Sequence, residues 1–376
     1  MNARERHIAA LTFGNPDKVP FSPGGPREST RAAWRTQGLP EDVHWFDYLC
    51  ELIGVEQETP KTPPVALGVG TLMIPQFEEK LIERKADSQI VQDWKGNICE
   101  ISNQFDVTYL RQAKDFCTRR WIKCPVENRD DWEQMKARYD VDAPGRFPDD
   151  FDQRCQTLKA RDTICTLAWS GPFWQLREWC GFEGLCLLMI QDPDFVHDMV
   201  DFWREFVLAV TRRVLERVTI DVLHISEDMA YKAHSMISPA MTREFLQPSY
   251  DAWVALAREF GVPIVDMDSD GYIGELIPIW IESGINVCDP IEVAAHNDIV
   301  EFRRTFGRTM AYRGGVDKRA LAKGGEVMRE EVMRVVPPLF KDGGFIPSCD
   351  HGVPSDISWP NFIDYSRLLA ELCGWL

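Results

Sequence analysis

One pattern is repeated six times from about residue 160 onward: an apolar run rich in β-branched residues, then polar residues, then a longer helix-like stretch. Parallel strands need long crossover connections, usually helices, so this alternation predicts a parallel sheet. The six segments that contain these apolar runs are DTICTLAWSG, TIDVLHISED, GVPIVDMDSDG, GINVCDP, RTMAYRGGVD and GGFIPSCDHG.

We expect two segments of the first 150 residues, KVPFSPGG and PVALGVG, to supply the remaining strands. The complete chain, residues 1–376, would then form one domain, a (β/α)8 TIM barrel with an N-terminal elaboration. A doubly wound open sheet is the alternative fold, but no glycine-rich phosphate fingerprint follows an early strand.

Charge and cysteine content exclude several classes of partner. The net charge of −17 would repel nucleic acids and anionic membranes, so we expect neither as a partner. No apolar run approaches the length of about 18 residues that a membrane span needs. The 11 cysteines are scattered without paired spacing, and the N-terminus has no apolar signal region. We therefore expect reduced thiols and a cytoplasmic protein.

Polar residues follow the predicted strands. A single acidic residue in such a place often caps the next helix. The carboxyl ends of parallel barrel strands share one rim, however, where active sites of this fold lie. Five sets together favour a functional mouth: Glu227 and Asp228; Asp266, Asp268 and Asp270; Cys288 and Asp289; Arg313 and Asp317; and Cys349, Asp350 and His351.

The three aspartates Asp266, Asp268 and Asp270 alternate, so on a strand they would share one face about 7 Å apart. Carboxylates this close need a proton, an arginine or a cation. Cys349 and His351 could reach the same side, and aspartate, histidine and thiolate all bind zinc. Arg313 could neutralise these aspartates in place of a metal ion. The spacing alone favours a plain acidic mouth over a metal site.

Further residues are candidates for substrate binding. Arg27 follows the first predicted strand and could bind a carboxylate through two hydrogen bonds. Trp169 and Trp174 could line an apolar pocket, although such residues are more often part of the core. We expect His224, inside VLHIS, to be a hydrogen-bonded residue of the barrel interior.

Four motifs together resemble the uroporphyrinogen decarboxylase superfamily: DVLHISEDMAYKAHSMISPAMTREFLQPSY, DSDG, YRGGVDKRAL and HGVPSDISWPNF. The resemblance runs from roughly residue 160 to the end and implies a single (β/α)8 barrel with its site at the C-terminal rim. The decarboxylases of this superfamily use no metal or cofactor. Its corrinoid-linked methyltransferases use zinc, held by a motif similar to His-x-Cys-Gly and by a later cysteine.

The zinc motif of the methyltransferases aligns with Asp268-Ser269-Asp270-Gly271. The resemblance therefore implies zinc bound by Asp268, Asp270 and His351, with Cys349 or Glu227 as a further ligand. Our first hypothesis is a zinc- and corrinoid-dependent methyltransferase, an O-demethylase of a small methoxylated compound. Asp228 would orient the substrate or move a proton, and a separate corrinoid protein would carry the cobalamin.

The alternative is a metal-free carboxy-lyase similar to uroporphyrinogen decarboxylase. Arg27 and Arg313 would bind carboxylates, and Asp228, Tyr231 and His351 would handle protons. A third hypothesis is a non-enzymatic barrel that only binds a tetrapyrrole or corrinoid. The sequence leaves the oligomeric state open, with a homodimer among the alternatives.

Overall fold

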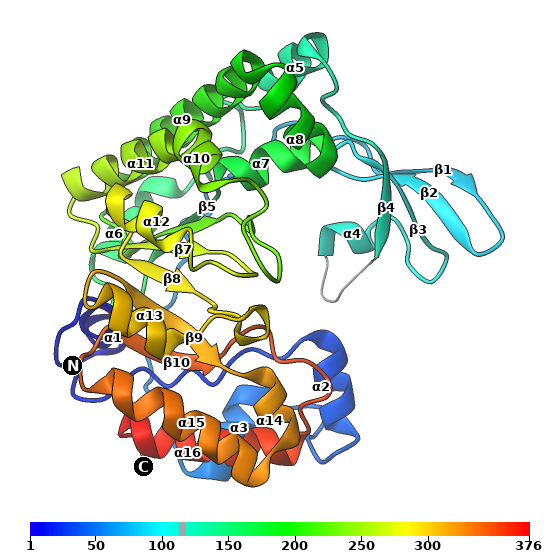
Figure 1. The fold of residues 1–376 in the computed structure, drawn as a ribbon. Helices are drawn as coiled ribbons and strands as arrows, with labels where there is room; N and C mark the ends of the chain where they lie inside the picture. Colours follow the sequence, from blue (N-terminus) through cyan, green and yellow to red (C-terminus); the bar gives the residue numbers. More distant parts are fainter. Residues whose placement is uncertain (113–117) are drawn as a thin grey trace.

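The computed structural model describes residues 1–112 and 118–376. Its main sheet contains six parallel strands in the order β10-β9-β8-β7-β6-β5, and each is paired in register with its neighbours. Figure 1 shows this sheet curving through the molecule, with helices on its outer side. All six predicted strands are present: β5 (Thr166–Ser170), β6 (Val222–Ser226), β7 (Ile264–Asp268), β8 (Val287–Asp289), β9 (Ala311–Val316) and β10 (Phe345–Cys349).

Helices follow the strands as the sequence pattern predicts. The predicted helix start at Ser238 and Pro239 is confirmed, because the Ser238 hydroxyl accepts a hydrogen bond from the backbone N–H of Met241. The helices after β5 are α7 (Pro172–Cys180), α8 (Phe182–Gln191) and α9 (Pro193–Leu215), then α10 (Pro239–Met241), the π-helix η1 (Thr242–Leu246), α11 (Gln247–Glu259), α12 (Ile277–Ser283), the 3-10 helix η2 (Val293–Ala295), α13 (Ile299–Phe306), α14 (Lys318–Lys323), α15 (Gly325–Phe340) and α16 (Trp359–Cys373).

The first predicted strand is an extended segment instead of a regular strand. Residues 19–26 run beside the end of β10, where Pro23 accepts a hydrogen bond from the Cys349 amide and Pro26 forms an isolated bridge with Val353. Pro20, Pro23 and Pro26 have no N–H to donate, so a continuous ladder cannot form there.

The second predicted strand, at residues 64–70, has no strand structure. In the described residues the six-stranded sheet is not closed into an eight-stranded ring, because β5 and β10 each pair with one strand. The parallel α/β architecture is thus confirmed, whereas the closed barrel is not seen.

The inner face of the sheet is filled in layers, because alternate residues of a strand point to the same side. Helix α1 (Ala3–Leu11) lies at the N-terminal end of the strands, where its Ala10 and Leu11 pack on a layer of apolar residues. Two residues further along the strands the inner layer is polar. The apolar layer consists of Val222, Ile264, Val287, Ala311 and Ile346, and we call the next layer, His224, Asp266, Asp289 and Arg313, the polar layer.

The remaining N-terminal elements include an antiparallel sheet that the sequence analysis did not predict. Figure 1 shows this sheet projecting from the body at the right. Lys95 forms an ion pair with Glu178 of α7 that ties the sheet to the body. These elements are α2 (Glu28–Arg35), α3 (Trp45–Ile53), β1 (Lys80–Arg84), β2 (Ser88–Gln92), β3 (Ile98–Ser102), α4 (Tyr109–Gln112), β4 (Arg119–Lys123), α5 (Arg129–Lys136) and α6 (Phe151–Lys159).

Within residues 1–112 and 118–376, no helix has the length and apolar character that a membrane span requires.

Candidate active site

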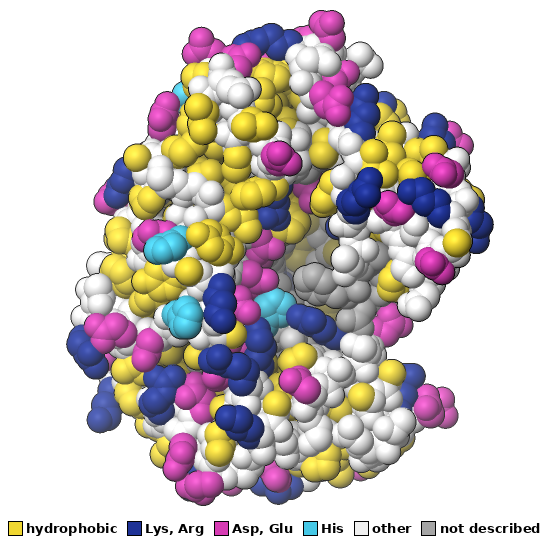
Figure 2. Space-filling view, turned by 45° about the vertical axis from the view of Figure 1, so that its right-hand side comes forward, with side chains coloured by type: hydrophobic (Ala, Val, Ile, Leu, Met, Phe, Trp, Pro, Cys, Tyr) yellow, Lys and Arg dark blue, Asp and Glu magenta, His cyan; other side chains and the backbone are white. Residues whose placement is uncertain are grey.

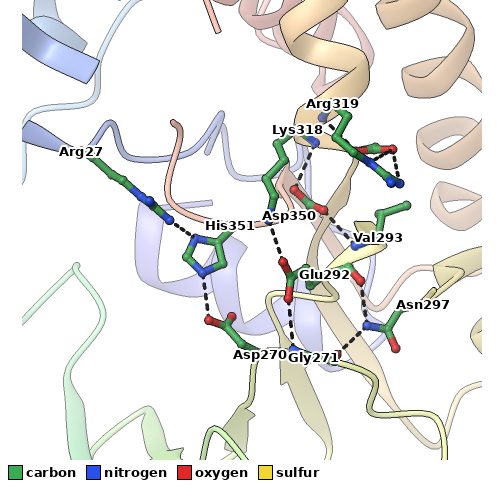
Figure 3. Close-up of polar contacts among 11 residues, drawn as sticks. Arg27, Asp270, Gly271, Glu292, Val293, Asn297, Lys318, Arg319, Asp350 and His351 are labelled. Carbon is green, nitrogen blue, oxygen red and sulfur yellow. Dashed lines mark hydrogen bonds and ion pairs between the residues drawn. The ribbon is translucent and has the colours of Figure 1, made fainter. Parts of the chain in front are cut away.

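Three side chains from distant parts of the chain meet at the C-terminal rim of the main sheet. Arg27 stands at the N-cap of α2, Asp270 follows β7, and His351 lies in the turn after β10. The Arg27 guanidinium contacts Nδ1 of His351 at 3.1 Å, and Nε2 of the same ring lies 2.9 Å from Oδ2 of Asp270 (Figure 3).

These contacts fix the protonation of His351. A guanidinium can only donate, so Nδ1 of His351 must accept and Nε2 carries the proton that is donated to Asp270. The hydrogen bond to Asp270 raises the pKa of His351, while burial and the charge of Arg27 oppose it. This arrangement corresponds to the Nε2–H tautomer of His351, whose proton points at the Asp270 carboxylate.

The turn that carries His351 is held by a buried acid that the sequence analysis did not assign to any role. Asp350 is fully buried and accepts hydrogen bonds from the backbone N–H groups of Val293, at 2.8 Å, and Lys318, at 3.1 Å. Burial raises the pKa of Asp350 to about 6. Lys318 in turn pairs with Glu292, whose other oxygen accepts from Gly271 (Figure 3). These bonds position the loops that follow β7, β8, β9 and β10.

Two further aspartates complete the mouth, which we define as Arg27, Asp228, Asp268, Asp270 and His351. Asp228 accepts a hydrogen bond at 3.0 Å from the backbone N–H of Asp270. Burial, followed by the charge of Asp228, raises the pKa of Asp268 to about 7. Burial also raises the pKa of Asp228. Figure 2 shows a hollow on this face that contains acidic, basic and histidine side chains.

Arg313, predicted as a rim residue, lies in the polar layer below the mouth. Its Nη2 donates to Oδ2 of Asp266 and, at 2.7 Å, to Oδ2 of Asp289. Nδ1 of His224 lies 3.0 Å from the same oxygen of Asp266. Arg313 therefore neutralises two inner carboxylates, which is one of the two alternatives that the sequence predicted. The structure places it below the mouth and not at the rim.

Comparison with known proteins identifies the family of this chain. A family model described as "Uroporphyrinogen decarboxylase (URO-D)" matches residues 122–363. The chain belongs to the uroporphyrinogen decarboxylase family. Its matched region contains four of the five mouth residues, and Arg27 lies outside it.

Solved structures and curated proteins were compared as well. A methyltransferase from Methanosarcina mazei covers 98% of both chains with a TM-score of 0.53 and 14% sequence identity, which supports the shared fold. A putative vitamin-B12 independent methionine synthase from Listeria monocytogenes covers 60% of this chain and 67% of its own, with a TM-score of 0.33 and 11% identity. No curated protein matches the sequence.

Glu227, proposed as a catalytic residue or metal ligand, points away from the mouth of this family member. It is fully buried and accepts hydrogen bonds from the Tyr250 hydroxyl and from the backbone N–H of Trp174 in the first turn of α7. Burial raises its pKa to about 7. Glu227 therefore anchors two helices, and its contacts lie outside the mouth.

Three other predicted site residues each have their own surroundings in the structure. Cys349 is buried on the outer side of β10, in the core between the sheet and the helices, and burial raises its pKa to about 12. The indole N–H of Trp169 donates to the Thr211 hydroxyl of α9, behind the sheet. Tyr231 lies on the loop after β6 with 51% of its surface exposed, and its backbone oxygen accepts a hydrogen bond from the Tyr272 N–H. The structure does not bring Cys349 or Trp169 to the mouth.

Trp174 stays near the mouth, together with an arginine that the sequence analysis missed. The Arg177 guanidinium lies 4.3 Å from the Trp174 ring and donates to the backbone oxygen of Asp228 at 3.0 Å. Trp174 is partly exposed at the start of α7. The spacing of 174 and 177 on one helix face was the available signal for this pair.

The mouth does not fit the zinc ion that the methyltransferase branch implies. Asp268, Asp270 and His351 do not form a group of ligand atoms close enough to hold one ion; among the described residues the one such group is His224, Asp266 and Asp289. We therefore derive no step of a reaction through zinc at the mouth.

Proposed function

We propose that the protein is a carboxy-lyase that removes a carboxyl group from a small molecule at a mouth without metal, with the chain 1–376 acting as one unit. Membership of the family supports an enzyme, and the donation from Arg27 to Nδ1 of His351 supports this branch. That contact keeps the imidazole neutral and directs its remaining proton into the mouth. Histidine held in this way suits proton transfer.

Decarboxylation breaks one carbon–carbon bond and replaces the lost carboxylate with a proton, so the enzyme needs an anion site and a proton donor. The substrate carboxylate would pair with Arg27 and displace its contact with His351. Nδ1 of His351 would then be able to take up a proton from bulk solvent, which replaces the proton that the mouth gives to the product. The electron pair left by departing carbon dioxide would be protonated from the mouth.

Asp268 is the acid that suits this last step best. Because its pKa is raised to about 7, a large share of the carboxyl groups carry a proton near neutral pH. Asp228 and Asp270 lie close enough for their charges to act on Asp268. Asp270 would pass protons between Asp268 and His351, and Trp174 would offer an apolar wall to the substrate.

The experiment is a decarboxylation assay in deuterium oxide with uroporphyrinogen, the substrate in the family's name, as the first compound. We expect carbon dioxide release and one deuterium per carboxyl lost. Asp268→Asn and His351→Gln should reduce the rate at least about 100-fold. His234→Gln, in an exposed loop, is the matched control. Full activity of both mouth variants would contradict the proposed roles.

A second candidate function is corrinoid-linked methyl transfer, the first hypothesis from the sequence. The match to a methyltransferase over 98% of both chains favours it. It would require zinc at Asp268, Asp270 and His351, a cobalamin-carrying partner protein and a methoxylated substrate. Methyl transfer to free reduced cobalamin that depends on added zinc, without carbon dioxide release, would favour this candidate over the carboxy-lyase.

A further inference from the structure

The polar layer contains buried carboxylate oxygens that have no hydrogen-bond partner among the described residues. Asp266 is 1% exposed, and its Oδ1 has no hydrogen-bond partner among the described residues. Oδ1 of Asp289 is likewise buried without a partner. Arg313 contributes one positive charge and contacts only the Oδ2 atoms of the two acids. An unpaired buried carboxylate oxygen is costly, and a cation placed between the acids would relieve that cost.

The same two acids and His224 have the geometry of a metal site. One ligand atom from each of His224, Asp266 and Asp289 lies within 4.8 Å of the others. The three residues occupy adjacent strands β6, β7 and β8, whose paired register fixes their separation. One imidazole nitrogen and two carboxylate oxygens suit Zn²⁺, Mn²⁺ or Co²⁺.

The orientation of His224 is also that of a ligand. Its Nδ1 faces Asp266, while Nε2 lies 3.2 Å from the Ser226 hydroxyl. A metal-bound histidine usually donates its other N–H to an oxygen that fixes the ring. Ser226 can fill that role, because a hydroxyl accepts as well as donates.

Space next to these residues would let an ion enter. A cavity of about 400 Å³ is lined by Asp266, His224 and Arg313 together with His7 of α1. The side chain of Arg313 is 31% exposed, so it can move into this volume and release the carboxylates. The remaining positions around an ion would be filled by water.

We propose that a divalent transition-metal ion binds on the inner face of the main sheet at His224, Asp266 and Asp289, in exchange for the contacts of Arg313 with the two acids. This inner site is separate from the mouth and lies one layer deeper. It is independent of the proton chemistry proposed above, in which none of its three ligands takes part.

The test is titration of the chelator-treated full chain with Co²⁺, followed by absorption spectroscopy and equilibrium dialysis. We expect one ion per chain with d–d bands of an N/O site. His224→Gln and Asp266→Asn should abolish binding, and Ser226→Ala should weaken it about tenfold. Arg313→Met removes the competing cation and should tighten binding about tenfold or more. This gain of affinity cannot arise from misfolding, so it remains decisive if a ligand variant unfolds.

Asp270→Asn and His351→Gln are the controls at the mouth, and both should bind Co²⁺ as the unmodified chain does. Absence of binding would overturn the inner site and leave the carboxy-lyase proposal standing. Binding that is lost in the mouth variants and kept in His224→Gln would overturn both proposals, because it would place the ion at the mouth.

Discussion

Gly171 lies so close to Glu227 that a β-carbon at position 171 would stand 2.1 Å from the carboxyl carbon of Glu227. The buried acid fills the space that a side chain would need and binds the first turn of α7. Gly171 sits between β5 and α7, at the N-cap of the helix. Position 171 therefore requires glycine, because the buried side chain of Glu227 occupies the space of a β-carbon.

Gly171→Ala should destabilise the protein by about 3 kcal/mol, because neither the backbone nor the buried carboxylate can yield easily. Urea denaturation measures the change. Gly184→Ala, in helix α8 with its nearest neighbouring atom at 3.9 Å, is the matched control and should be neutral or slightly stabilising. Equal effects of the two substitutions would contradict the packing argument.

Asp268→Asn should stabilise the protein at alkaline pH. The pKa of about 7 lies above that of an unfolded aspartate, about 3.9, so the folded state holds the proton more tightly. The stabilisation that the protonated Asp268 carboxyl group provides is fully present below about pH 4 and is lost as the pH rises through about 7. Asparagine mimics the neutral acid and should raise the free energy of unfolding by about 2 kcal/mol at pH 8. The same gain at pH 4 and pH 8 would show that the carboxyl group does not titrate as described.

The pKa of His351 should respond in opposite directions to its two neighbours. Asp270→Asn removes the hydrogen bond that raises the pKa, so the pKa should fall by about 1. Arg27→Gln removes a charge that lowers it, so the pKa should rise. Titration of the imidazole signals by NMR, assigned with His351→Gln, measures both changes. Shifts in the same direction would be incompatible with His351 lying between the two residues.

Cys349 should resist thiol reagents in the folded protein. It is 3% exposed, and its pKa of about 12 leaves almost no thiolate near neutral pH. Labelling with iodoacetamide, mapped by mass spectrometry with and without urea, checks this. The partly exposed Cys186 is the internal control. Rapid labelling of Cys349 in the native protein would indicate a thiol that faces the mouth.

Strand positions were predictable from this sequence, but the direction of several side chains was not. Cys349 and His351 stand two residues apart, which on a continuous strand would place them on one face. Strand β10 ends at Cys349, however, and the turn after it redirects His351 toward Asp270. Glu227 is misassigned for the same reason, since β6 ends one residue earlier.

Long-range partners set the rest of the site. Nothing local in the sequence indicates that Arg27 would meet a histidine 324 positions away, because the contact depends on the segment that runs beside β10. The alternation of Asp266 and Asp268 was visible, but their different partners were not. Asp266 has an arginine and a histidine, whereas Asp268 lies among other acids.

We predict that His351 is a neutral imidazole held between Arg27 and Asp270, and not a zinc ligand. The measurement that tests it most directly is nitrogen-15 NMR of the histidine rings at pH 8, before and after addition of one equivalent of Zn²⁺. We predict a proton on Nε2 of His351, an unprotonated Nδ1, and no change of either signal with zinc. A proton on Nδ1 together with a zinc-induced shift of Nε2 would contradict the claim and restore the metal-dependent methyltransferase.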